Sequence, residues 1–154
     1  MRWLCSSTAL FVFLLAIASS VATEPAPPSA EEDLKTFLGK DGKAGVWELQ
    51  IEKTHTVVRL EFRPRTPDAK PDADLVGRLS AAFPAGEGGA DFLYRLEVKE
   101  KERFLVVRGP AFKEGARIPY RLKDGKLQLE GGAADVPELG KTELKGAWGR
   151  IESK

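Results

Sequence analysis

The sequence predicts an all-β fold, an eight-stranded antiparallel up-and-down barrel that follows a short N-terminal helix. Apolar and polar residues alternate with a period of two in most of the predicted strands, so each strand has one apolar and one polar face. The connections are too short for parallel crossovers, which need a dozen or more residues. Long and short connections also gather at opposite ends, and this difference favours a barrel over a sandwich.

The hairpin in Ile118–Glu130 fixes the register of the predicted sheet. Its centre, Asp124-Gly125, suits a two-residue turn of the primed type, which needs a positive φ at both positions. Leu122 then faces Leu127, and the apolar residues of both runs share one face. A slip by one residue would destroy this sorting, so turn and pattern support each other.

Residues 1–22 have the pattern of a secretory signal peptide. Arg2 precedes the continuous apolar run Ala9–Ala18, and Ser20-Val21-Ala22 places small residues where a signal peptidase recognises them. An uncleaved membrane anchor is the alternative, but the apolar run is much shorter than the about 20 residues that usually cross a bilayer. We therefore expect cleavage after Ala22, a secreted or periplasmic protein, and no stable membrane anchor.

Removal of this segment leaves a neutral chain without cysteine. It takes away Arg2 and the single cysteine, Cys5, which leaves 23 basic and 23 acidic residues. A neutral domain gives no electrostatic reason to expect nucleic acid or an anionic membrane as partner. Disulfides and thiolate metal sites are excluded. The length suffices for one domain with one core, which we place at 31–154.

The first elements of the mature chain follow from composition. Residues 23–30 are rich in proline and alanine and predict a flexible leader. Acids followed by apolar residues at helical spacing predict a short helix over 31–38, and the glycines of 39–45 predict a loop.

Eight segments carry the strand pattern. One of them, 75–83, also has apolar residues at helical spacing, so a helix is an alternative there. The predicted strands are 46–53, 56–63, 75–83, 91–99, 103–108, 118–123, 126–130 and 142–152.

The connections predict two different ends of the barrel. The links 54–55, 84–90, 109–116 and 131–141 fall at one end, which we expect to be a loop-rich mouth. The other end has the link 64–74, two tight turns and the helix. Apolar side chains near the mouth are candidates for binding a small ligand, with the two tyrosine hydroxyls as polar groups at the rim; these candidates are Phe83, Phe92, Tyr94, Ile118, Tyr120 and Leu129. A barrel of this size can also be filled by its own side chains.

A family resemblance rests on the two ends of the predicted barrel. Gly45-Val46-Trp47 opens the first strand, and Arg150 lies on the last strand. This pattern resembles that of the lipocalins, in which Gly-x-Trp closes the base of the barrel and a basic side chain stacks on the tryptophan, a cation–π contact. The run from Tyr120 to Leu127 is similar to hairpins of lipocalin-like small secreted bacterial proteins. Trp148 is expected to help fill the base.

The sequence indicates no catalytic or metal site. The single histidine, His55, falls at a predicted hairpin tip and is expected to be solvated, because no oriented partner is evident. One histidine and no cysteine make zinc improbable, and no cofactor is predicted. A hydrolase with two carboxylates is a third alternative, since the separation of such a pair is not visible in a sequence.

These observations predict a non-enzymatic, extracytoplasmic binding module. The leading hypothesis is a barrel that admits a small apolar or amphipathic ligand through its mouth. The alternative is a protein-interaction or protease-inhibitor-type barrel with a solid core, in which the leader at 23–30 inserts into a protein partner.

Overall fold

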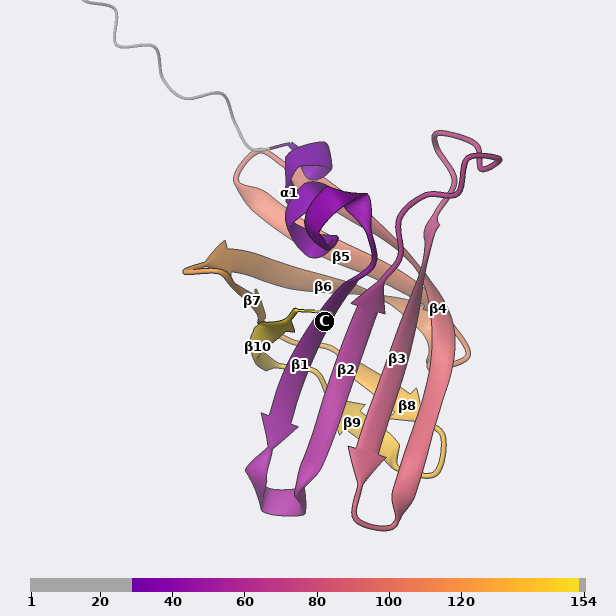
Figure 1. Ribbon diagram of the computed structural model, residues 1–154, viewed down its shortest axis with the longest axis vertical. Helices are drawn as coiled ribbons and strands as arrows, with labels where there is room; N and C mark the ends of the chain where they lie inside the picture. The colour runs from indigo at the N-terminus through magenta and orange to yellow at the C-terminus, as the bar shows by residue number, and fades with distance from the viewer. Residues whose placement is uncertain (1–28, 153–154) are drawn as a thin grey trace, which may run out of the picture.

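The computed structural model describes residues 29–152, so the predicted signal peptide and positions 23–28 of the predicted leader lie outside the described residues. One α-helix, two short 3₁₀ turns and ten strands make up this part of the chain (Figure 1). The elements are α1 Ala30–Phe37, η1 Lys40–Gly42, β1 Gly45–Ile51, η2 Glu52–Thr54, β2 Thr56–Phe62, β3 Leu75–Phe83, β4 Gly86–Lys99, β5 Glu102–Gly109, β6 Phe112–Lys123, β7 Lys126–Leu129, β8 Ala133–Val136, β9 Gly140–Glu143 and β10 Gly146–Ile151.

Eight of the strands close into the predicted antiparallel up-and-down barrel, in the order β1-β10-β7-β6-β5-β4-β3-β2. The segment 75–83 is strand β3, as its alternating burial shows, and the helix alternative is wrong. The hairpin of β6 and β7 has the predicted register, with Leu122 opposite Leu127. Asp124 and Gly125 have φ values of 53° and 71°, which confirms the primed turn.

The helix begins one residue earlier than predicted and ends at Phe37. The backbone N–H of Glu32 donates to the Ser29 hydroxyl at 3.2 Å, so Ser29 is the N-cap. The assignment of 29 and 30 to a flexible leader is therefore wrong.

The prediction of a loop-rich, open mouth is wrong. β4 begins at Gly86 and β6 at Phe112, so the expected loops 84–90 and 109–116 are largely strand. The expected loop 131–141 contains β8 and the first half of β9, which form a separate two-stranded hairpin. Glycine-rich sequence has no side-chain alternation, and its strands are therefore invisible to periodicity.

The hairpin of β8 and β9 covers the end of the barrel where the mouth was expected. Ala134, Val136 and Leu144 are buried, and the Asp135 N–H donates to the Ala111 carbonyl at 2.8 Å. A Cβ at Gly88 would lie 2.1 Å from the Pro137 carbonyl oxygen, so only glycine permits this approach. Figure 1 shows this hairpin at one end of the barrel and α1 at the other.

The predicted last strand, 142–152, is divided into two strands. Its first residues belong to β9, and Gly146, with φ 153°, begins β10. β10 pairs with β7 through its first three residues and with β1 through its last three. A single short strand thus closes the barrel.

Candidate functional site

The six predicted ligand-binding side chains lie in or beside the core. Phe92, Tyr94, Ile118, Tyr120 and Leu129 are at most 3 % exposed, whereas Phe83 is half-buried at the end of β3. The five buried side chains belong to one hydrophobic cluster inside the barrel. The structure therefore brings these five together, but among other side chains and not around an open mouth.

A series of aromatic rings runs through the interior from α1 to the start of β6. Phe37 of α1 packs edge-on against Phe62, with ring centroids 4.8 Å apart. Phe62 is 6.2 Å from Phe92, and Phe92 is 5.6 Å from Phe112. Such spacings are those of rings in direct contact. Side chains therefore fill the length of the barrel along this line.

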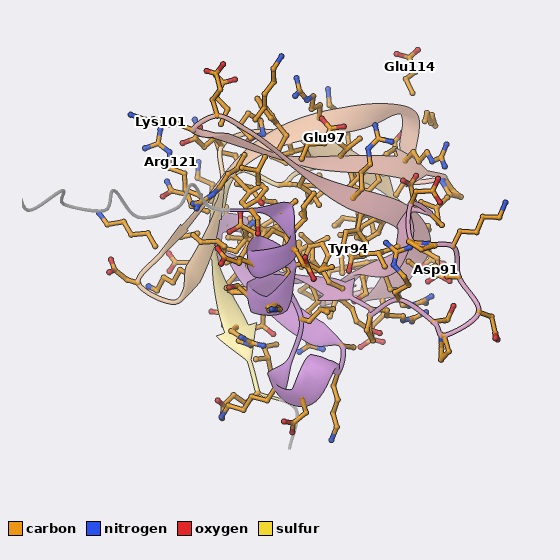
Figure 2. The ribbon with its side chains drawn as sticks, turned by 90° about the horizontal axis from the view of Figure 1, so that it is seen from above. Asp91, Tyr94, Glu97, Lys101, Glu114 and Arg121 are labelled. Atoms are coloured by element: carbon orange, nitrogen blue, oxygen red, sulfur yellow. The ribbon has the colours of Figure 1, made fainter. Side chains whose placement is uncertain are left out.

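The two tyrosine hydroxyls lie toward the helix end, and their predicted position at the mouth is wrong. Tyr120 donates to Asp33 Oδ2 of α1 at 2.7 Å, and Tyr94 donates to the carbonyl oxygen of Arg63 at 2.9 Å. Figure 2 shows the Tyr94 side chain inside the barrel. Burial raises the pKa of both phenols above the ordinary value of 10.0, and for Tyr120 the bond to Asp33 raises it further.

Asp33 joins the helix to the barrel through two contacts. It is 5 % exposed, and besides the Tyr120 hydroxyl it faces Arg103, whose Nε lies 3.0 Å from the same Oδ2. This N–H does not point at the oxygen closely enough to form a hydrogen bond, so the contact is an ion pair only. The sequence did not indicate this link, because Asp33 and Tyr120 are 87 positions apart.

The base of the barrel has the geometry that the lipocalin resemblance predicts. The Trp47 indole N–H donates to the Phe37 carbonyl at 3.1 Å, and Arg150 places its guanidinium 5.7 Å from the centre of the Trp47 ring. Arg150 also donates to the Leu38 carbonyl. A Cβ at Gly45 would lie 1.9 Å from the Phe37 carbonyl oxygen, which explains the glycine.

Trp148 fills the interior beside β7. It is fully buried, and its indole N–H donates to the Leu144 carbonyl at 3.0 Å. This bond holds the start of β10 against the segment that follows β9.

A hollow of about 550 Å³ lies on the outside, between the hairpins β4–β5 and β6–β7. Pairing between β5 and β6 ends at Phe104 and Pro119, and beyond this pair the two hairpins diverge (Figure 1). We call this hollow the wedge; it is lined by residues 101–104, 119–123 and Glu130.

The rim of the wedge has an excess of basic residues, four lysines and arginines against the two acids Glu102 and Glu130. Lys101 and Lys123 are exposed and are in no ion pair within 29–152. Arg121 pairs with Glu130, and Arg103 with the buried Asp33. Figure 2 shows Lys101 and Arg121 on the same side of the barrel, well away from Glu114.

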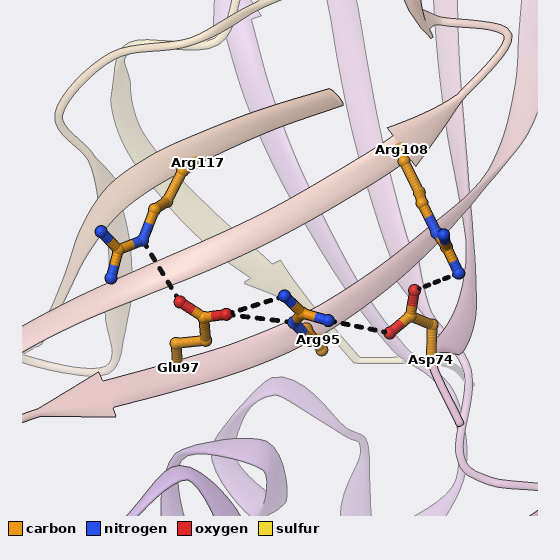
Figure 3. Close-up of polar contacts among 5 residues, drawn as sticks. All are labelled: Asp74, Arg95, Glu97, Arg108 and Arg117. Carbon is orange, nitrogen blue, oxygen red and sulfur yellow. Dashed lines mark hydrogen bonds and ion pairs between the residues drawn. The ribbon is translucent and has the colours of Figure 1, made fainter. Parts of the chain in front are cut away.

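A chain of alternating charges lies beside the wedge on the outer face of β4, β5 and β6 (Figure 3). Glu97 contacts Arg117 at 3.2 Å and Arg95 at 3.0 Å, and Asp74 contacts Arg95 at 3.9 Å and Arg108 at 2.8 Å. The arginine side chains are more than half exposed, so solvent screens these pairs and they add little stability. Their effect is to hold three guanidinium groups in place on this face.

Arg117 connects this charge chain with the wedge. Its guanidinium lies 3.8 Å from the centre of the Phe104 ring, which is a close cation–π contact. Phe104 in turn lines the wedge. The wedge and the arginines therefore form one continuous surface with apolar and basic parts.

His55 and the possible metal ligands were the remaining candidates for chemistry. His55 is exposed at the turn after η2, with a left-handed backbone (φ 48°, ψ 37°). Within 29–152, no three histidine, cysteine, aspartate or glutamate side chains are grouped so as to hold a metal ion. In the same residues, no helix has the length and apolar character needed to cross a membrane.

The chain was compared with protein-family models, with curated proteins and with solved structures. No match was found in any of the three comparisons.

The charge of one segment of the sequence indicated the basic rim, although the net charge of the whole chain did not. The whole chain is nearly neutral, but residues 99–126 include nine basic and only four acidic side chains. Four of these basic residues, Lys101, Arg103, Arg121 and Lys123, line the wedge, whereas Lys113 pairs with Asp135 near the other end of β6. Counting charge by segment, and not over the whole chain, would have directed attention to this face.

Proposed function

We propose that the chain is a non-enzymatic binding module that recognises a protein partner with its outer surface. The observation that carries this proposal is the interior: five of the six candidate ligand-binding side chains are buried against one another and against neighbouring rings. This packing supports recognition at the outer surface over carriage of an apolar ligand, since a barrel with a rigid core is a suitable frame for surface recognition.

We also propose that the protein acts outside the cytoplasm as a lipocalin-like barrel with a solid core. The signal-peptide pattern of residues 1–22 supports export. The contact between Trp47 and Arg150, at the base of eight antiparallel strands, supports the family relation. Both statements rest on these observations alone.

The rival function is carriage of a small apolar ligand. It requires a conformational change that recognition at the outer surface does not require. The β8–β9 hairpin would have to leave the end of the barrel, and Ala134 and Val136 would then lose their burial. Ligand would also have to displace aromatic rings such as Phe92 and Phe112. A bound lipid is therefore the result that separates the two functions.

Native mass spectrometry and thermal unfolding of the full chain, with oleate, retinol and cholesterol as probes, test the proposal. We expect no adduct and no change in Tm, because a ligand that binds the native state raises Tm. The variant Leu129→Ala is the positive control: it opens an apolar cavity, and benzene should bind to it and not to the wild type. A stoichiometric lipid adduct on the wild-type chain would refute the solid-core function.

A further inference from the structure

The wedge exposes the edge of a strand. Residues 120–123 of β6 pair with β7 on one side, but their other side faces the wedge, because pairing with β5 ends at Pro119. Within 29–152 this edge has no strand as partner. Backbone N–H and C=O groups require hydrogen bonds, and an open edge can receive an added strand.

The side chains along this edge determine which residue types an added strand should carry. Arg121 and Lys123 are exposed on the outer face, whereas Tyr120 is buried and Leu122 half-buried on the inner face. Lys101 adds a further cation across the wedge. Since side chains of a strand alternate between the two faces, the complementary segment alternates acidic and apolar residues.

Other occupants fit this edge less well. The leader of this chain has three prolines within 23–28, and proline has no N–H to donate to a ladder. A second copy would bring Lys101 and Lys123 of one chain against the same lysines of the other, and lysines on an edge repel such pairing. A polysaccharide or a lipid offers no backbone ladder to the open edge.

We propose that the wedge binds an extended acidic segment of a partner protein as an additional strand along residues 120–123. This proposal rests on the outward-facing function proposed above and gives that function a site and a partner chemistry. Backbone hydrogen bonds hold the segment, carboxylates lie beside Arg121 and Lys123, and apolar side chains contact Leu122.

Fluorescence anisotropy with the full chain tests this proposal. The probe is a labelled peptide of about six residues, an ordinary strand length, in which Glu and Val alternate and both termini are blocked. A second peptide carries N-methyl groups on alternate residues and so lacks the N–H donors along one of its two edges. The wedge variant is Lys101→Glu with Lys123→Glu, and the matched control is Lys53→Glu with Lys70→Glu, two lysines that are also exposed and that change net charge equally.

We expect saturable binding to the wild type and to the control variant. Binding should weaken at least about tenfold for the wedge variant and for the N-methylated peptide. Equal affinity of the two variants, no effect of N-methylation, or no binding at about 1 mM peptide would overturn the proposal. A dimer that competes with the peptide would make a second copy the occupant, which also overturns it.

A failure of the wedge proposal can be told apart from a failure of the proposed function, because the peptide and the lipids are measured separately. If neither lipid nor peptide binds, the solid-core function stands and the wedge site falls. If lipid binds the wild-type chain, the function itself falls, whatever the peptide does.

Discussion

The interior of the barrel and the wedge satisfy their polar groups in opposite ways. Inside, the indole N–H groups of Trp47 and Trp148 and the hydroxyls of Tyr94 and Tyr120 all donate to protein oxygens. At the wedge, lysines and a strand edge face solvent. The difference teaches that the aromatic core pairs its indole and phenol groups internally, whereas the groups left open for recognition lie at the wedge.

The largest effect should come from removing an interior ring. Trp47→Ala deletes a large buried side chain together with its bond to Phe37 and its contact with Arg150, and should lower the free energy of unfolding by about 3–5 kcal/mol. Urea denaturation measures this loss. Val76→Ala is the outer control, since Val76 is 41 % exposed on β3, and its effect should stay within about 0.5 kcal/mol. A similar loss of unfolding free energy for both variants would show that burial of Trp47 in the barrel does not account for its effect.

Tyr120 donates to a carboxylate and Tyr94 to a neutral carbonyl, so loss of the two hydroxyls should lower stability by different amounts. Tyr120→Phe leaves the buried Asp33 carboxylate without a donor and should cost about 1.5–3 kcal/mol, whereas Tyr94→Phe leaves only a carbonyl and should cost about 1 kcal/mol. Denaturant unfolding of the two variants gives the comparison. If Tyr94→Phe costs more, then Asp33 does not depend on Tyr120.

The fit of the β8–β9 hairpin over the barrel can be tested at one glycine. Gly88→Ala places a methyl group where the Pro137 carbonyl lies and should cost about 1–3 kcal/mol through overpacking. Gly149→Ala, on β10, meets no atom within 4 Å and is the matched control. Hydrogen exchange of 133–143 should accelerate only in the first variant. Unchanged exchange there would mean that the hairpin does not rest on Gly88.

Alkaline pH should destabilise the fold through the two buried tyrosines, Tyr94 and Tyr120. Both tyrosines have a pKa above 10.0 in the folded chain, so at pH values above about 10 the unfolded chain loses protons that the folded chain keeps. The unfolded state then binds fewer protons, and stability falls as pH rises, by at most about 1.4 kcal/mol per tyrosine for each pH unit. Denaturant midpoints between pH 9 and about 11 measure this slope. The double variant Tyr94→Phe, Tyr120→Phe should abolish it, and a slope that persists would assign it to other groups.

Local rules predicted the strands that show clear alternation and the turn at Asp124-Gly125, whereas the contact of Arg150 with Trp47 was expected from the family resemblance. They failed at 86–90 and 133–136, where small residues pair because of tertiary contacts such as that of Gly88 with Pro137. They also gave no sign of where the wedge opens, although the charge of 99–126 marked its basic rim. Its position depends on where pairing between β5 and β6 stops, and no local sequence pattern specifies that point.

Xenon binding to crystals of the wild-type chain under pressure tests the central claim most directly. Xenon enters apolar cavities that are empty. A solid interior predicts no xenon site between Phe92, Tyr94 and Tyr120, which are all buried in one cluster. A xenon atom among these three side chains would reveal an empty apolar cavity in the interior and would contradict the account.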